Sequence, residues 1–244
     1  MTIMDKPTSE MYQPELTRLP NLNVLRKFLR VFLKGVAWLL IRILLRVEVT
    51  GREYFPTKGP MLMVSNHLGD ADGIVGLAVA KAPFDVMGKI ELLEVPVLGR
   101  LMEWYGSIWV HRGQPDRRAL RAVLDGLAAG RMVAIAPEGR ESLTGALEEG
   151  TNGAAYIALK TDAPVLPVAF TGTENERIYR NLKKLRRTRI TVTAGPPFRL
   201  ANTGNRRVDI QHGTQLIMET LAQLLPPSYQ GVYREKVEED HDRA

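Results

Sequence analysis

The sequence of 244 residues contains no cysteine, few histidines and no long apolar run. The lack of cysteine excludes disulfides, thiolate metal ligands and a cysteine nucleophile, and it fits a reducing compartment. The four histidines are scattered and make no metal-binding spacing, which disfavours metal catalysis: His67, His111, His212 and His241. A G-x-S-x-G motif is also missing, so the sequence lacks the nucleophilic serine turn of α/β-hydrolases.

Two kinds of apolar segment are absent near the N-terminus. No apolar stretch directly follows the first methionine, so we expect no cleaved signal peptide. The longest uncharged part of the segment that follows is the seven residues from Gly35 to Ile41. A spanning helix needs roughly 20 mostly apolar residues, so we do not expect a simple transmembrane helix.

Acidic residues are missing between Val24 and Arg46, where six basic residues occur. Arg26, Arg30 and Lys34 are four residues apart and share one helix face, while apolar side chains cover the other. Gly35 is expected to divide the segment into a pair of helices. A basic amphipathic pair of this kind is typical of a membrane interface. The alternative is a helical pair packed on the domain with its arginines in solvent.

The rest of the sequence alternates predicted strands and helices, which indicates an α/β protein. We predict a single domain with a mixed, mostly buried sheet flanked by helices and preceded by the basic helical pair. The predicted boundaries are a flexible polar arm at 1–21, a membrane-surface helical segment at 22–47, the domain at 48–230, and a solvated tail at 231–244.

The net charge of +6 suits either a polyanion or an anionic membrane surface. Seven basic residues lie between Glu176 and Arg189, but Tyr179 is the one aromatic residue among them and no nucleic-acid motif is visible. We therefore expect this run, with the N-terminal segment, to face anionic lipid and not nucleic acid. A solvated charged loop is the alternative.

The stretch NHLGDAD, residues 66–72, follows a predicted strand at 61–66 and leads into a predicted helix at 72–82. The chain can fold back in such a turn and bring Asp72 to the ring of His67. A carboxylate on one ring nitrogen fixes the tautomer and supports protonation of the other, as in a general base with its orienting partner. Asp70 is a competing carboxylate. The alternative is a capped helix in which Asp72 is the N-cap.

A His-Asp pair without its own nucleophile suits a reaction in which the base activates a hydroxyl of the substrate. Ser65 lies inside the predicted strand and shares a face with His67. Two other stretches end or follow predicted strands, GSIWVHR at 106–112 and APEGRES at 136–142. We expect them at the same edge of the sheet as His67, where their arginines would suit a phosphate monoester.

In this order, NHLGDAD, GSIWVHR, APEGRES and LPVAF (166–170) resemble the four motifs of the glycerolipid acyltransferase family. The family patterns are N-H-x-x-x-x-D, G-x-I-x-V-D-R, F-P-E-G-T-R-S and a V-P-V strand, and the resemblance extends from Val49 to Leu200. It implies transfer of a fatty acyl chain from acyl-CoA or acyl carrier protein to the hydroxyl of lysophosphatidic acid, giving phosphatidic acid. It further implies no metal or other cofactor, and a peripheral or monotopic location on the cytoplasmic face of the cell membrane.

The resemblance also implies roles for individual residues. His67 would deprotonate the acceptor hydroxyl, and Asp72 would orient His67. Arg112 would contact the acceptor phosphate, with Glu138 and Gly139 shaping the pocket. The full set of implied substrate-binding residues is Asn66, Arg112, Glu138, Gly139, Arg140 and Pro167.

Four positions depart from the family patterns. His111 replaces an aspartate, Ala136 replaces a phenylalanine, and Arg140-Glu141 replaces a threonine-arginine pair. Because Glu141 would repel a phosphate, a lysolipid with a different head group is an alternative acceptor. The second alternative is a non-catalytic basic module on this scaffold that binds membrane or nucleic acid.

Overall fold

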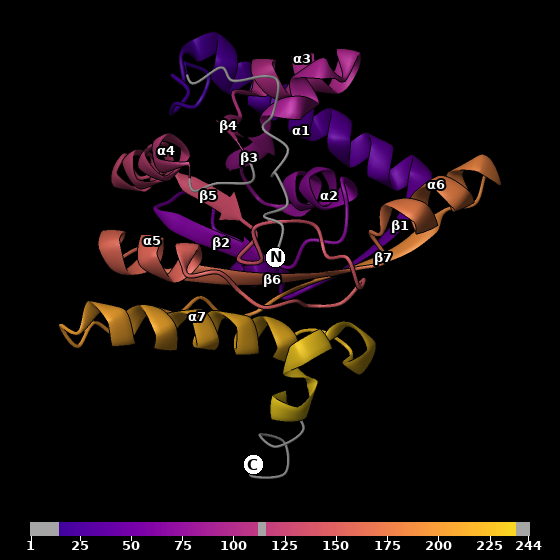
Figure 1. The fold of residues 1–244 in the computed structure, drawn as a ribbon. Coiled ribbons are helices and arrows are strands. Elements are labelled where there is room, and N and C mark those ends of the chain that lie inside the picture. The colour runs from indigo at the N-terminus through magenta and orange to yellow at the C-terminus, as the bar shows by residue number, and fades with distance from the viewer. Residues whose placement is uncertain (1–14, 112–115, 238–244) are drawn as a thin grey trace, which may run out of the picture.

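The computed structural model describes residues 15–111 and 116–237, which form a mixed sheet between two layers of helices (Figure 1). Seven strands belong to this sheet in the described ranges: β1 (Leu45–Thr50), β2 (Met61–Ser65), β3 (Asp85–Lys89), β4 (Ile108–Val110), β5 (Met132–Ile135), β6 (Val165–Thr171) and β7 (Thr188–Ala194). Their order is β1-β7-β6-β2-β5-β3-β4. All neighbours are parallel except β6 and β7. The predicted α/β fold class is confirmed.

The helices cover both faces of the sheet. They are α1 (Val24–Leu44), α2 (Ala71–Val79), α3 (Pro96–Tyr105), α4 (Arg117–Ala128), α5 (Gly153–Thr161), α6 (Asn175–Lys183) and α7 (Arg206–Gln223), with short 3₁₀ turns at Arg52–Tyr54, Ile90–Glu94, Pro227–Tyr229 and Gly231–Tyr233. Successive side chains of a strand point to opposite faces. In β2, Leu62 and Val64 join the core beneath α4, α5 and α7, whereas Met61 and Met63 join the core beneath α1 and α2.

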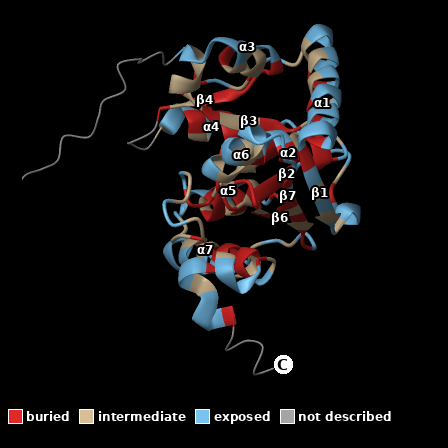
Figure 2. Ribbon diagram, turned by 90° about the vertical axis from the view of Figure 1, so that its right-hand side faces the viewer, coloured by how far each residue is buried: buried red, intermediate tan, exposed pale blue. Residues whose placement is uncertain are grey.

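The N-terminal segment forms one helix, α1, and not the predicted pair. Gly35 lies inside this helix, which begins at the N-cap Asn23. The alternative expectation, a helical pair packed on the domain with its arginines in solvent, fails for Arg30, which is buried with its guanidinium 2.6 Å from Asp85 on β3. The apolar side instead faces outward along α1 (Figure 2). The cause is long-range: the fully buried Asp85 needs a counter-charge.

Other boundaries differ from the prediction. Thr17 and Pro20 are buried, so residues 15–21 pack on the domain and do not form a flexible arm. β1 begins at residue 45, inside the predicted helical segment, and pairs with β7. The basic run 176–189 is largely the helix α6. Val237 is buried in the core, so the predicted solvated tail packs on the domain at this residue, whereas 231, 232 and 234–236 are exposed. The remaining parts of the predicted arm and tail, 1–14 and 238–244, lie outside the described residues.

One edge of the sheet gathers the stretches that the sequence singled out. Because β2, β5, β3 and β4 are parallel neighbours, their carboxyl ends lie at the same edge. The loops that leave this edge include NHLGDAD after β2 and APEGRES after β5. Open α/β sheets form their binding clefts at such an edge.

Candidate active site

His67 and Asp72 are in contact at the start of α2. The His67 Nδ1 atom lies 2.8 Å from Asp72 Oδ2. An ionised carboxylate can only accept, so Nδ1 carries the proton and Nε2 is left as the basic nitrogen. The Asp72 side chain is nearly buried, whereas the His67 side chain is 20% exposed. The pair therefore has a shielded acid and a ring that a substrate can reach.

The loop between β2 and α2 is shaped around the Asp72 carboxylate. Asp72 Oδ2 also accepts the backbone N–H groups of Leu68 at 2.7 Å and Gly69 at 3.0 Å. Gly69 needs to be glycine, because a Cβ there would lie 2.6 Å from the carbonyl oxygen of Thr173. These bonds fold the chain back so that residues five apart meet.

Asp70, the competing carboxylate, is placed elsewhere. It is the N-cap residue of α2, although its side chain makes no capping bond. Its carboxylate accepts the Tyr179 hydroxyl at 3.5 Å, and its backbone N–H donates to the Asn175 side chain at 2.9 Å. Asp70 thus joins the loop to α6, and Asp72 is the partner of the imidazole.

Glu138 ties the loop after β5 to the loop that carries His67. Its Oε1 accepts the His67 N–H at 3.1 Å, and its Oε2 accepts the Glu148 N–H at 2.8 Å. The Ser142 N–H donates to the His67 carbonyl at 2.7 Å. Burial raises the pKa of Glu138, and the two backbone donors partly oppose this shift. Glu138 therefore positions the backbone of His67.

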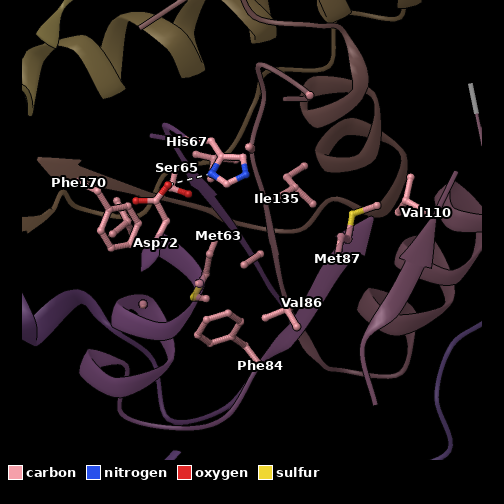
Figure 3. Close-up of a pocket in the computed structure, with 18 of the residues that line it drawn as sticks. Met63, Ser65, His67, Asp72, Phe84, Val86, Met87, Val110, Ile135 and Phe170 are labelled. Carbon is pink, nitrogen blue, oxygen red and sulfur yellow. Dashed lines mark hydrogen bonds and ion pairs between the residues drawn. The ribbon is translucent and has the colours of Figure 1, made fainter. Parts of the chain in front are cut away.

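An apolar cavity of about 220 Å³ opens beside the imidazole. His67, Asp72 and Ser65 lie at one end, and Phe84 and Val86 lie at the other (Figure 3). Its walls come from β2, β3, β5, β6 and the inner face of α2. A site of this shape accommodates a hydrocarbon chain whose reactive end reaches His67.

Two charged side chains outside the predicted site set lie at the site: Glu141 is near the reactive nitrogen, and Lys89 pairs with Glu141. Glu141 Oε1 lies 4.0 Å from His67 Nε2 and 4.0 Å from the Lys89 ammonium. Asn175 from α6 donates to the other oxygen of Glu141 at 3.3 Å. Lys89 ends β3 and lines the cavity. The available signal was the position of Lys89 at the end of the short segment FDVMGK (84–89), because parallel strands bring their last residues to one edge of the sheet.

The other predicted substrate-binding residues are distributed as follows. Gly139 lines the cavity, in a turn with φ of 76° that favours glycine. Asn66 is buried and exchanges two hydrogen bonds with the backbone of Phe170, so it joins β2 to β6. Pro167 is buried within β6 beside β2. Arg140 is paired with Glu148 at 2.6 Å. Arg112 lies outside the described residues.

The structure shows contacts within the protein for three of these residues, and their role in substrate binding stays a prediction. The polar atoms of Asn66 are taken up by backbone bonds, Pro167 packs inside the sheet, and the guanidinium of Arg140 is held by a carboxylate. These contacts join Asn66 and Pro167 to the neighbouring strands and Arg140 to Glu148. His67, Asp72, Glu138 and Gly139 meet at one place.

Comparisons with known proteins bear on this arrangement. A model of the acyltransferase family matches residues 46–171. The chain is 29% identical over 133 residues to a 1-acyl-sn-glycerol-3-phosphate acyltransferase of Borreliella burgdorferi, covering 54% of this chain and 53% of the relative. It is 29% identical over 151 residues to a chloroplastic 1-acyl-sn-glycerol-3-phosphate acyltransferase of Arabidopsis thaliana, covering 61% and 42%. The matched part of the chain thus spans about half the length of these curated relatives.

A solved structure shares the fold. The crystal structure of the 1-acyl-sn-glycerophosphate (LPA) acyltransferase PlsC from Thermotoga maritima matches with a TM-score of 0.60 and 21% identity. The match covers 82% of this chain and 81% of that one. It shows that the arrangement of sheet and helices is common to both proteins.

Proposed function

Because the chain belongs to the acyltransferase family, we propose that it moves a fatty acyl chain from an acyl thioester to the free hydroxyl of a lysophospholipid. The observation that carries the proposal is the 2.8 Å contact between His67 and Asp72 at the mouth of an apolar cavity. Lysophosphatidic acid is the first candidate acceptor, supported by the activity that the names of the relatives state.

In the proposed mechanism, His67 Nε2 takes the proton of the acceptor hydroxyl as its oxygen attacks the thioester carbonyl. The carbon–sulfur bond then breaks, and the departing thiolate receives the proton from the imidazolium. Asp72 stabilises the positive charge that His67 carries between these two transfers. The products are an ester and a free thiol, and the route uses neither an acyl-enzyme nor a metal or other cofactor.

The donor's acyl chain is proposed to occupy the cavity beside His67. Its deep end, formed by Phe84 and Val86, is apolar, and its open end carries the imidazole (Figure 3). A chain inserted tail first would present its thioester carbonyl at His67. The thiol carrier, coenzyme A or acyl carrier protein, would remain outside.

A second candidate is a lysolipid whose head group is not a phosphate monoester, and Glu141 favours it. The Glu141 carboxylate lies near His67 Nε2 and pairs with the Lys89 ammonium, which is at the same cavity. This arrangement disfavours an anionic group at the same place. A phosphate contact by Arg112 would oppose this effect and stays a prediction from the sequence.

The proposed location is the cytoplasmic face of the cell membrane, with anionic lipid as the partner. No helix in the described ranges is long and apolar enough to cross a bilayer. Large apolar side chains on α1 are exposed, including Phe28 at 65% and Phe32 at 55%. Arg180 and Lys183 on α6 are exposed as well. These two surfaces support a peripheral or monotopic attachment.

The activity is tested by measuring thiol release from acyl-CoA and from acyl-loaded acyl carrier protein with a panel of lysolipids that differ in head group. We expect acceptor-dependent thiol release and an acylated lipid product. If Glu141 selects the head group, Glu141→Gln will raise the use of lysophosphatidic acid relative to lysolipids without a phosphate monoester. A purely membrane- or nucleic-acid-binding module would release no thiol with any acceptor.

A further inference from the structure

A second apolar cavity lies between α1, α2 and α6 and has a volume of about 150 Å³. We call it the α1/α2/α6 groove. α1 contributes Leu40 and Leu44, α2 contributes Ala71 and Ile74, and α6 contributes Ile178 and Leu182. Figure 1 shows the C-terminal end of α1 beside α6, with α2 next to both. The groove is therefore lined by aliphatic side chains from three helices.

α2 separates this groove from the cavity beside His67. Asp72, Gly73 and Gly76 face the first cavity, whereas Ala71 and Ile74 face the groove. Ala71 directly precedes the carboxylate that holds the imidazole. The two cavities thus lie on opposite sides of α2, and both reach its first turn, which carries Asp72.

The rim of the groove is suited to a lipid. Leu40, Leu44, Ile74 and Leu182 are each between 40% and 44% exposed, and Leu40 and Leu44 continue into the outward apolar side of α1. Arg186 is the charged residue at the groove, and it complements an anionic head group. The groove therefore opens onto the surface from which a lipid chain would enter.

We infer that the α1/α2/α6 groove binds the hydrocarbon chain of the acceptor lysolipid. The inference rests on the proposed function, in which both substrates carry an alkyl chain. The cavity beside His67 holds the alkyl chain of the donor, so the chain of the acceptor needs a second site. The acceptor then lies with its chain on one side of α2 and its hydroxyl at His67. The groove holds the part of the chain nearest the glycerol, and the remainder stays in the lipid layer.

The kinetic test uses a series of lysophosphatidic acids with short, water-soluble chains of increasing length and no detergent, because a micelle would compete with the groove. Each methylene that enters the groove is expected to lower the acceptor KM about fourfold in the wild-type protein. Ile74→Trp fills the groove and is expected to remove this dependence, while the dependence on donor chain length stays as in the wild type.

Two control variants make the result specific. Val86→Phe shortens the donor cavity and is expected to change the preferred donor length while leaving the acceptor dependence intact. Val232→Trp places the same side chain as Ile74→Trp at an exposed position that lines neither cavity and is expected to change neither dependence. An unchanged acceptor dependence in a folded Ile74→Trp variant would overturn the inference.

A binding test does not depend on turnover. The sequence has no cysteine, so Leu182→Cys introduces one thiol at the groove and Val232→Cys introduces one elsewhere. A lysophosphatidic acid should slow alkylation of Leu182→Cys, whereas glycerol 3-phosphate, which lacks the chain, should not. Equal labelling rates with both compounds contradict the inference. If alkylation of Leu182→Cys slows as protein concentration rises in the absence of lipid, a second copy of the chain covers the groove. That result also contradicts the inference.

These tests separate the groove from the proposed activity. Absence of thiol release with every acceptor refutes the acyltransferase function, and the labelling assay still reports whether a chain enters the groove. Normal transfer with no effect of Ile74→Trp and no protection of Leu182→Cys refutes the groove alone.

Discussion

At the scale of single residues, the proposed chemistry depends on how the backbone of His67 is held. The Glu138 carboxylate accepts hydrogen bonds from two backbone N–H groups, those of His67 and Glu148. Glutamine has one acceptor oxygen, so in Glu138→Gln one partly buried N–H group loses its partner. We expect kcat to fall with little change in KM and the free energy of unfolding to fall by about 1–3 kcal/mol. Steady-state kinetics and urea unfolding measure both effects.

The control for this substitution is Glu94→Gln, at an exposed glutamate outside the site. It should leave both quantities nearly unchanged. A Glu138→Gln variant with the wild-type kcat would show that the loop does not need this brace.

The sequence was enough to predict the His67–Asp72 pair because the two residues are five positions apart, one in the loop after β2 and one in the first turn of α2, where local geometry decides the contact. The residues of the loop alone could not decide between Asp70 and Asp72 as the partner of His67. The structure decides, because Asp70 is bound to Tyr179 and Asn175 on α6, more than a hundred positions later in the chain. Glu141 and Lys89 meet across 52 positions, so no local pattern could reveal their proximity to the imidazole.

At the scale of elements, α1 is fixed to the domain by a buried ion pair. Arg30 donates to Asp85 at 2.6 Å and to the carbonyl oxygens of Tyr105 and Gly106. Arg30→Ala would leave the buried Asp85 with Arg131, whose guanidinium lies farther away at 3.7 Å. We expect a loss of about 3–5 kcal/mol in the free energy of unfolding.

Lys27→Ala is the matched control, because Lys27 is exposed on the same helix. Its effect should stay within about 0.5 kcal/mol. Equal stabilities for the two variants would show that the Arg30–Asp85 contact does not anchor α1. Helical periodicity could not predict this anchor, since it places basic residues on a face without showing that a buried acid lies opposite.

A second prediction at this scale concerns the start of α4. Burial opposes ionisation of Asp116, but N–H groups of His111, Ala119 and Arg118 and the His111 ring outweigh it and hold the pKa of Asp116 below its ordinary 3.8. Such a group stabilises the fold above its unfolded pKa, and the contribution is lost as pH falls through the folded pKa. Asp116→Asn keeps an N-cap acceptor but removes the charge.

Urea unfolding of both proteins over a pH series measures this contribution. The wild-type protein should be the more stable at neutral pH, and the difference from Asp116→Asn should shrink as pH falls below about 4. A difference that stays constant over the series would show that the carboxylate charge does not stabilise α4.

At the scale of the whole molecule, the arrangement of layers followed from the alternation of strand and helix patterns, and the shared edge followed from parallel pairing. The surface character was harder to predict. The sequence indicated an amphipathic N-terminal segment, but which side faces outward depended on Asp85. The apolar side is exposed, so the proposed attachment rests on Phe28 and Phe32 more than on Arg30.

This view predicts the effect of surface changes on membrane binding. Phe28→Ser with Phe32→Ser removes two exposed aromatic rings from α1 and should weaken co-sedimentation with vesicles containing anionic lipid. Val232→Ser changes an exposed apolar residue outside α1, in the 3₁₀ turn Gly231–Tyr233, and should bind as the wild type does. Equal binding of the three proteins would mean that α1 is not the attachment surface.

The central claim is that His67, held by Asp72, removes the proton from the acceptor hydroxyl. The most direct measurement is the rate of acceptor-dependent thiol release by the wild-type protein, His67→Ala and Asp72→Asn, each shown to be folded by circular dichroism. Loss of the base should lower kcat by about 10²–10⁴-fold, with a smaller loss for Asp72→Asn. Thiol release by folded His67→Ala at the wild-type rate would contradict the account.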